Sequence, residues 1–303
     1  MKWPVACYYY NRSWTDDYDM GLIDYNIEKY SPRQLVIIPF ILLALSLVLL
    51  AINTAATGLP VTPGIDFSGG TAVTLVTSDS KEQLQATFAG FPLIDIGEGV
   101  NKGKFLKFGT MDDATYNSLS SLISQKYPDA KVDQIGESFG KTLQSQAVIA
   151  MIFSFIGMSI VVFLSFRTFI PSVAVVLSAF ADMAMTAAAM NIIGIPLTLG
   201  TTAALLMLIG YSVDSDILLT NRVLKRQGKL NDKLQGAFHT GIIMTSTTFA
   251  AATAMFLVSW FGQVQIIMEI SAVLLIGLIA DVLNTWLTNA GILKWYVQKG
   301  GSK

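Results

Sequence analysis

Six apolar segments, each roughly 20 residues or longer, constrain the fold of this chain most strongly. They cover residues 35–55, 146–166, 169–190, 198–221, 241–261 and 265–293. In the hydrocarbon core of a bilayer every backbone polar group must be hydrogen-bonded within the protein, so each segment is expected to be a helix. Charged residues make up 14% of the chain, well below the roughly 25% of soluble domains. The sequence therefore predicts a polytopic α-helical membrane protein with six transmembrane helices.

Lys and Arg residues are distributed unevenly among the short loops. They occur before the first span, between the second and third, after the fourth and after the sixth, whereas the loops 191–197 and 261–264 contain none. Cytoplasmic loops carry the excess of basic residues. We therefore expect a multi-pass protein of the cytoplasmic membrane with a cytoplasmic segment at 1–34 and a cytoplasmic tail at 294–303. The first apolar stretch is too long for a signal peptide.

A polar stretch at residues 60–142 separates the first span from the other five, which fill residues 146–293. Alternating apolar residues predict strands at 71–77, 93–96, 104–108 and 131–135, and helical periodicity predicts helices at 80–89 and 112–126. The order βαββαβ is that of a ferredoxin-like domain. We expect an α+β ferredoxin-like external domain between the first and second spans.

Several classes of function are disfavoured by composition. The chain has one Cys, Cys7, and one His, His239, which argues against internal disulfides, Cys/His metal sites and His-based catalysis. A net charge of −1 gives no indication of nucleic-acid binding. We expect no metal and no other cofactor, and we expect the lipid bilayer as a partner.

Five acidic residues lie within the predicted spans: Asp182, Asp214, Asp216, Asp281 and, near the outer end of the sixth span, Glu269. A charged side chain at the centre of a bilayer costs at least about 2.5 kcal/mol, so an acid there is a functional-site hypothesis by default. A proton relay is one interpretation. The alternative is that these acids bond hydroxyl groups and stabilise contacts between helices.

The two acids of the fourth span point in different directions. Asp214 and Asp216 are roughly 200° apart around a helix, and Ser212 and Ser215 share a face with Asp216. If the third and fourth spans are neighbours, Asp182 could approach either acid. Two carboxyl groups in a dry setting can share and exchange a proton. We expect Asp214, facing Asp182, to be the main relay acid and Asp216 to be the second.

Further polar side chains are candidates to support this site. Small hydroxylated residues allow close approach and hydrogen bonds between membrane helices, and a long basic side chain at a span end can reach the headgroups. Packing alone is the alternative role for the hydroxyl cluster of the fifth span. The candidates are Tyr211, Ser212, Ser215, Arg222, Thr245 and Ser246.

Three motifs resemble those of a known family. The first follows the first span and contains Gly64, Asp66, Phe67, Gly69 and Gly70; the others are Ile209–Asp214 with Asn221-Arg222, and Thr245-Ser-Thr-Thr248. Together they resemble SecF-type protein-export membrane proteins, a family related to RND-type transporters, and the pattern is most similar to archaeal members. Span count, insert position and orientation agree over nearly the whole chain.

The resemblance implies a non-enzymatic accessory subunit that pairs with SecD, associates with the SecYE translocon and assists a translocating polypeptide. In bacterial members proton movement is thought to drive the external domains. This chain departs from the bacterial pattern at four places. Asp214-Ser215 stands where bacterial members have Asn-Asp, and Asn221 where they have Asp. Gly241 stands where they have Arg, and Ala181-Asp182 where they have His-Asp.

Two other functions remain as alternatives. Half of an RND-type exporter of lipids or small molecules would have similar spans, and co-purification with SecD would distinguish it from an export subunit. An intramembrane aspartyl protease would also place acids on neighbouring spans. Its Gly-x-Gly-Asp motif is absent, since Asp214 follows Gly210-Tyr-Ser-Val.

Overall fold

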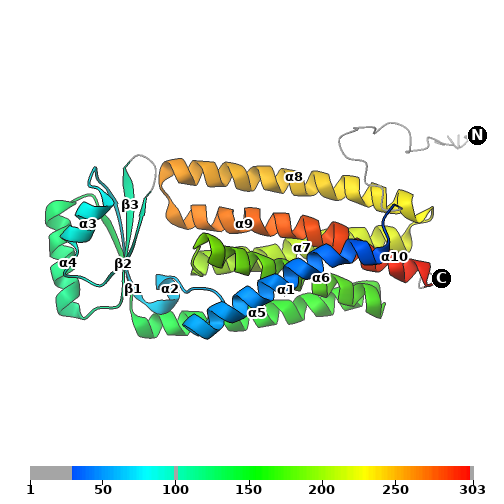
Figure 1. The fold of residues 1–303 in the computed structure, drawn as a ribbon, viewed down its shortest axis with the longest axis horizontal. Coiled ribbons are helices and arrows are strands. Elements are labelled where there is room, and N and C mark those ends of the chain that lie inside the picture. The colour runs from blue at the N-terminus through cyan, green and yellow to red at the C-terminus, as the bar shows by residue number, and fades with distance from the viewer. Residues whose placement is uncertain (1–28, 99–101, 301–303) are drawn as a thin grey trace, which may run out of the picture.

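The computed structural model describes residues 29–98 and 102–300, so most of the predicted N-terminal segment 1–34 lies outside the described residues. The described chain forms an elongated bundle of helices with a small α+β domain at one end (Figure 1). The first span begins and the last span ends at the opposite end of the bundle (Figure 1).

Six helical spans in the described residues are long and apolar enough to cross a membrane, which confirms the predicted number. The first five are α1 (Pro32–Thr57), α5 (Glu137–Phe166), α6 (Phe169–Ile193), α7 (Leu199–Lys225) and α8 (Leu230–Gly262). The sixth consists of α9 (Gln265–Leu283), the π-helical turn η2 (Asn284–Asn289) and α10 (Ala290–Gln298).

Three helices extend well beyond their predicted apolar segments. Helix α5 begins at Glu137, within the stretch 60–142 that was expected to belong to the external domain. Helix α8 begins at Leu230, well before residue 241, because its first turns are amphipathic and bury Leu234 and Ala237 against neighbouring helices. Helix α10 continues into the predicted tail and ends at Gln298. The Lys294 ammonium donates to the Tyr30 carbonyl at 2.7 Å, which ties the last helix to the start of α1.

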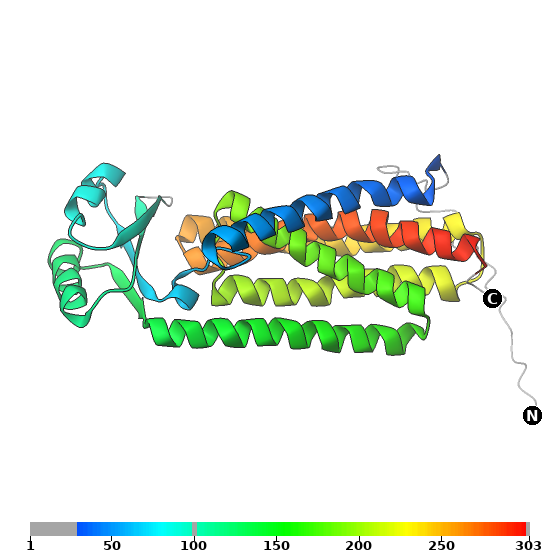
Figure 2. The ribbon, with the colours of Figure 1, turned by 60° about the horizontal axis from the view of Figure 1, so that its bottom comes forward.

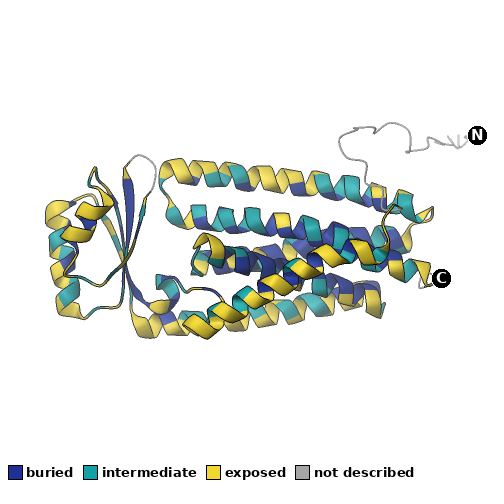
Figure 3. Cartoon of the chain, viewed as in Figure 1, coloured by how far each residue is buried: buried dark blue, intermediate teal, exposed yellow. Residues whose placement is uncertain are grey.

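Helices α6, α7 and α9 form the centre of the bundle. Helix α7 packs against α5, α6, α8 and α9, and the buried surface concentrates on α6 and α7 (Figure 3). Helix α5 runs along the outside of the bundle (Figure 2), and α5 and α8 expose most of their apolar side chains. This pattern fits a bundle whose centre is protein and whose outer helices contact lipid.

The α+β domain, called the insert domain below, runs from α2 to β4. Its elements are α2 (Ile65–Ser68), β1 (Gly70–Val76), α3 (Lys81–Thr87), β2 (Leu93–Glu98), β3 (Gly103–Phe108), α4 (Asp113–Lys126) and β4 (Lys131–Ile135). The strands form an antiparallel sheet in the order β2-β3-β1-β4. After α2 the element order is βαββαβ, which confirms the predicted ferredoxin-like fold.

The core of the insert domain lies between the sheet and the helices α3 and α4 (Figure 1). Its fully buried side chains include Leu84, Phe88, Leu106, Phe108 and Leu119. The rings of Phe88 and Phe108 meet edge to face with centroids 5.5 Å apart, a favourable aromatic geometry. The domain thus has a hydrophobic core separate from that of the bundle.

Asp79 and Tyr127 form the strongest polar contact at the rim of this core. The Tyr127 hydroxyl donates to Asp79 Oδ2 at 2.5 Å. Burial, together with this bond, raises the pKa of Tyr127 to about 12, and the same bond holds the pKa of Asp79 below its usual value.

Asp79→Asn should therefore weaken the insert domain at pH 7 but not in acid. A carboxyl group whose pKa is lowered by folding adds stability above its unfolded pKa of about 3.9 and loses it as the pH falls through the folded value. The measurement is hydrogen-exchange protection of the β1 amides at pH 7 and pH 3, relative to intrinsic rates. Asp95→Asn, at an exposed position of β2, is the control. A difference between wild type and Asp79→Asn that stays constant with pH would contradict this role.

Candidate functional site

A polar cluster lies inside the bundle where α6, α7, α9 and η2 meet. It contains three carboxylates that are at most 1% exposed, Asp182 of α6, Asp216 of α7 and Asp281 of α9. Its other members are also buried: Ser212, Asn284, Thr285 and Asn289. We call these seven residues the buried carboxylate cluster.

Helical spacing places these side chains together. On α7, Ser212, Ser215 and Asp216 occupy one buried face, as predicted from their i, i+3 and i+4 spacing. On the last span, Asp281 is followed at i+3 and i+4 by Asn284 and Thr285. The π-helical turn η2 begins at Asn284, and such turns occur frequently at functional sites.

Asp182 is held by two donors. Ser212 Oγ donates to Asp182 Oδ2 at 2.5 Å, and Asn284 Nδ2 donates to Asp182 Oδ1 at 2.7 Å. These bonds join α6 to α7 and to η2. Ser212 also lies close to Asp281, so its hydroxyl is near two carboxyl groups, of which it bonds Asp182.

Thr285 forms a second hydroxyl bridge. Its Oγ1 lies 2.8 Å from Asp216 Oδ1 and 3.2 Å from Asp281 Oδ1, and Asn289 Nδ2 donates to the same Asp216 oxygen at 2.8 Å. A hydroxyl has one proton and can donate to one carboxylate at a time. Both contacts are satisfied when one of the two carboxyl groups carries a proton and donates it to the hydroxyl.

The cluster is therefore a row in which carboxyl and hydroxyl groups alternate: Asp182, Ser212, Asp281, Thr285 and Asp216. Within the described residues, every hydrogen-bond donor to these three carboxyl groups is a Ser, Thr or Asn side chain. Charges buried without an opposite charge are costly. A neutral, protonated carboxyl group would avoid that cost, and Asp216 Oδ2 forms no hydrogen bond in the structure.

Within the described part of the chain, no three His, Cys, Asp or Glu side chains are arranged to hold a metal ion. The ion pairs of the described residues, Lys104–Glu98 and Lys141–Glu137, lie outside the cluster.

The prediction that Asp214 faces Asp182 is wrong. Ser212, rather than Asp214, points toward α6 and bonds Asp182. Since each residue turns a helix by about 100°, Asp214 lies roughly 200° from Ser212, and it is exposed on the surface of α7. The structure thus brings Asp182 and Asp216 into the cluster and leaves Asp214 outside it.

Four other predicted residues, Tyr211, Thr245, Ser246 and Arg222, lie outside the buried carboxylate cluster. The buried Tyr211 hydroxyl lacks a hydrogen-bond partner and lies toward Thr245 of α8, which is buried too. Ser246 is exposed. Arg222 bonds α8, donating to the Gly236 carbonyl and, at 2.7 Å, to Thr240 Oγ1. Arg222 therefore joins two helices at the end of the bundle away from the insert domain.

Three cluster members on the last span, Asn284, Thr285 and Asn289, were not among the predicted site residues. Asp281 was recognised as an acid within a span but not assigned to the site. Their signal in the sequence is the run of polar residues Asp281, Asn284, Thr285, Thr288 and Asn289 at helical spacing within an otherwise apolar span.

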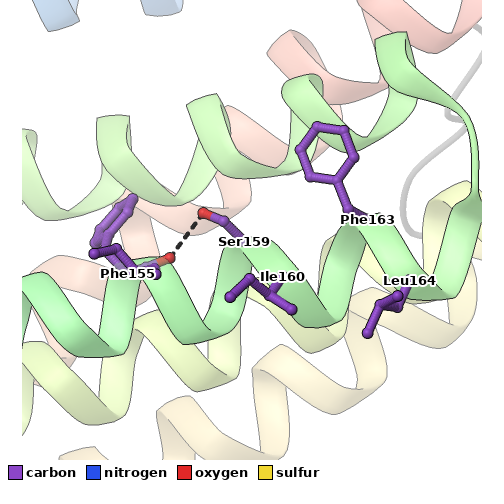
Figure 4. Close-up of a pocket in the computed structure, with 6 residues that line it drawn as sticks. Phe155, Ser159, Ile160, Phe163 and Leu164 are labelled. Carbon is purple, nitrogen blue, oxygen red and sulfur yellow. Dashed lines mark hydrogen bonds between the residues drawn. The ribbon is translucent and has the colours of Figure 1, made fainter.

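A shallow apolar hollow on α5 does not contribute to this site. It is lined by Phe155, Ile156, Ser159, Ile160, Phe163 and Leu164 and contains no titratable group (Figure 4). Ser159 Oγ donates to the carbonyl of Phe155 at 2.7 Å within the helix. Such a surface is typical of a helix in contact with lipid acyl chains.

Comparisons with known proteins agree with this architecture. Residues 115–299 match the family described as protein export membrane protein SecD/SecF, C-terminal. The chain is 58% identical over 282 residues to a protein-export membrane protein SecF of Methanolacinia petrolearia, covering 93% of this chain and 100% of that protein. It is 39% identical to a protein-export membrane protein SecF of Haloferax volcanii, over 92% of this chain and 96% of that one.

A solved structure shows the same fold. The crystal structure of SecDF from Thermus thermophilus, a translocon-associated membrane protein, superposes with a TM-score of 0.69 at 22% sequence identity. The match covers 88% of this chain and 38% of the SecDF chain. The present chain therefore spans well under half of that longer protein.

Proposed function

The chain belongs to the SecF family of protein-export membrane proteins, and from this premise we propose that it is an accessory subunit of the Sec export machinery. It acts with SecD, associates with the SecYE translocon and assists a polypeptide that is crossing the cytoplasmic membrane. The proton gradient supplies energy through the buried carboxylate cluster. Alternating carboxyl and hydroxyl groups inside the bundle are the observation that carries this proposal.

The proposed orientation puts both termini in the cytoplasm and the insert domain outside. Basic residues support it. The start of α1, the end of α7 and helix α10 lie at the end of the bundle opposite the insert domain (Figure 1), and they contain Arg33, Arg222 and Lys294 respectively. The insert domain then lies on the side where a translocated polypeptide emerges.

An exposed face of α7 supports a membrane partner such as SecD. Ala203, Met207, Gly210 and Asp214 follow one another at helical spacing, and all four are exposed. An acid turned toward acyl chains would be costly. A partner helix with a hydrogen-bond donor opposite Asp214 would remove that cost, and the small residues Ala203 and Gly210 would allow it to approach closely.

The cluster is suited to moving protons because its row crosses helix boundaries. Asp182, Asp216 and Asp281 come from three helices, and each bridging hydroxyl contacts carboxyl groups of two residues. A hydroxyl that accepts a proton on one side can release another on the opposite side. A change of protonation then alters the bonds that hold α7 against α6 and the last span.

Reconstitution into vesicles tests the function. Vesicles containing SecYE and SecD, with or without this chain, would be compared for the rate at which a polypeptide crosses the membrane, before and after an ionophore collapses the gradient. We expect this chain to add a gradient-dependent component and to co-purify with SecD. Co-purification with a pump subunit in place of SecD would favour the RND-type exporter, and export unaffected by the chain would refute the proposal.

Thr285→Val should reduce the gradient-dependent component by about tenfold or more, because a hydrogen bond to a charged group is worth about 1.5–3 kcal/mol. Valine keeps the shape of the side chain and removes the bridging hydroxyl. Thr288→Val is the matched control, since Thr288 lies on the same turn but bonds Asn284 Oδ1 and no carboxylate. Equal rates for the two variants would exclude Thr285 from the relay.

A further inference from the structure

The motif from Gly64 to Gly70 lies outside the cluster, yet its segment joins the insert domain to the bundle. Residues 60–66 run beside the turn between α6 and α7 and exchange hydrogen bonds with it. Asn191 bonds the Pro60 carbonyl at 2.8 Å and the Thr62 amide at 3.2 Å. The Leu197 amide donates to the Thr62 carbonyl, and the Gly64 amide to the Leu197 carbonyl, both at 2.8 Å.

Asp66 completes this series at the first residue of α7. Its Oδ2 accepts a hydrogen bond from the Leu199 amide at 2.8 Å. The first amides of a helix have no partner within the helix, and a carboxylate there also interacts favourably with the helix dipole. Thr198 caps the Thr201 amide at 3.1 Å. Asp66 therefore adds a second cap, supplied by a distant part of the chain.

The other side of the motif is packed against the start of α5. Gly140 of α5 lies so close to the motif that a β-carbon there would be 3.0 Å from the Gly69 amide nitrogen and the Phe67 carbonyl oxygen. A β-carbon at Gly69 would be 2.8 Å from Glu137 Cα, and its φ of +77° also favours glycine. Strand β1 begins at the next residue. The sheet is thus attached to α5 by close backbone packing, to the turn before α7 by backbone hydrogen bonds, and to α7 itself by the Asp66 side chain.

Contacts with the opposite side of the bundle involve side chains. The Gln263 side chain, at the turn between α8 and α9, lies against Gly103 of β3. Lys107 of β3 and Asp66 both lie near Glu269 of α9. The insert domain therefore packs closely against α5 and bonds the start of α7, whereas its contacts with α8 and α9 involve the side chains of Gln263 and Glu269.

We propose that Asp66 is a positioning residue that staples α7 to the insert domain, so that the domain and α7 shift together relative to α9 and η2. This inference rests on the proposed proton coupling. Ser212 and Asp216 belong to α7, whereas Asp281, Thr285 and Asn289 belong to the last span. A shift of α7 makes or breaks the bonds between Asp216 and the last span, and a change in those bonds moves the insert domain.

Distances between two spin labels test the staple on the purified full-length chain, without any export assay. The labels are placed at Asn117→Cys on α4 and Phe261→Cys on α8, both exposed, in a Cys7→Ser background. Asp216→Asn imitates a permanently neutral carboxyl group. We expect this substitution to shift the distribution of label distances, and we expect Asp66→Ala to abolish that shift.

Two variants separate positioning from folding. Asp66→Asn retains an oxygen that accepts from the Leu199 amide, so the shift should persist. Ser80→Ala removes the cap of α3, a bond of the same kind within the insert domain, and the shift should persist there too. Three results would each contradict the proposed role of Asp66. The shift could persist in Asp66→Ala, it could be lost equally in Ser80→Ala, or it could be absent when Asp216→Asn is introduced. This experiment does not measure export, so a negative result would contradict the role of Asp66 without contradicting the proposed role in export.

Discussion

Asp216→Asn should abolish the part of polypeptide export that depends on the proton gradient and leave the remainder unchanged. Asn fills the same volume and can still bond Thr285 and Asn289, so the bundle should fold. It cannot take up or release a proton, which interrupts the row at its end on α7. In reconstituted vesicles the rate of export with a gradient should fall to the rate measured after an ionophore is added.

Asp214→Asn is the control, because Asp214 lies two residues away and is exposed outside the cluster. We expect gradient-dependent export and co-purification with SecD to be retained in this variant, because Asn keeps an oxygen that can accept a hydrogen bond from the proposed partner helix. The opposite result, with export lost in Asp214→Asn and retained in Asp216→Asn, would move the relay to the surface of α7.

Most of the fold could be predicted because the signals that specify it are local. Apolar runs of spanning length identify membrane helices, and the periods of strands and helices identified the elements of the insert domain. The start of α8 at Leu230 was harder to predict from the sequence. Its first turns carry Asp232 and Lys233, so average hydropathy hides a helix that amphipathic packing stabilises.

The site was predicted in part for a different physical reason. Spacing along α7 correctly grouped Ser212, Ser215 and Asp216, but spacing within one helix cannot show which face turns toward a neighbour. That choice depends on packing between helices: Ser212 meets Asp182, and Asp214 is left at the surface. The contribution of η2 depends on a change of helical period at Asn284, for which the residues give no simple rule.

At Gly241, an aromatic ring occupies the space that the Arg of bacterial members would need. The resemblance to bacterial SecF proteins aligns an Arg with this position, but a β-carbon at Gly241 would clash with Cζ2 of Trp286. Trp286 is buried and packs edge to face on Phe238, with ring centroids 5.0 Å apart. The indole ring of η2 therefore leaves no room for a side chain on α8 at this point.

Gly241→Ala should destabilise the protein by about 1–3 kcal/mol, the usual cost of overpacking, and Gly241→Arg should prevent correct folding. The measurement is thermal unfolding in detergent, followed by tryptophan fluorescence. Gly210→Ala is the control, since a β-carbon at that helical glycine meets nothing within 4 Å, and it should be neutral or slightly stabilising. Trp286→Phe should make Gly241→Ala less costly in a double-mutant cycle. Because Trp286 lies beside Thr285 on η2, Gly241→Ala should also weaken gradient-dependent export. If Gly241→Ala and Gly210→Ala were equally stable, the Trp286 ring would be able to move aside freely and the packing argument would be wrong.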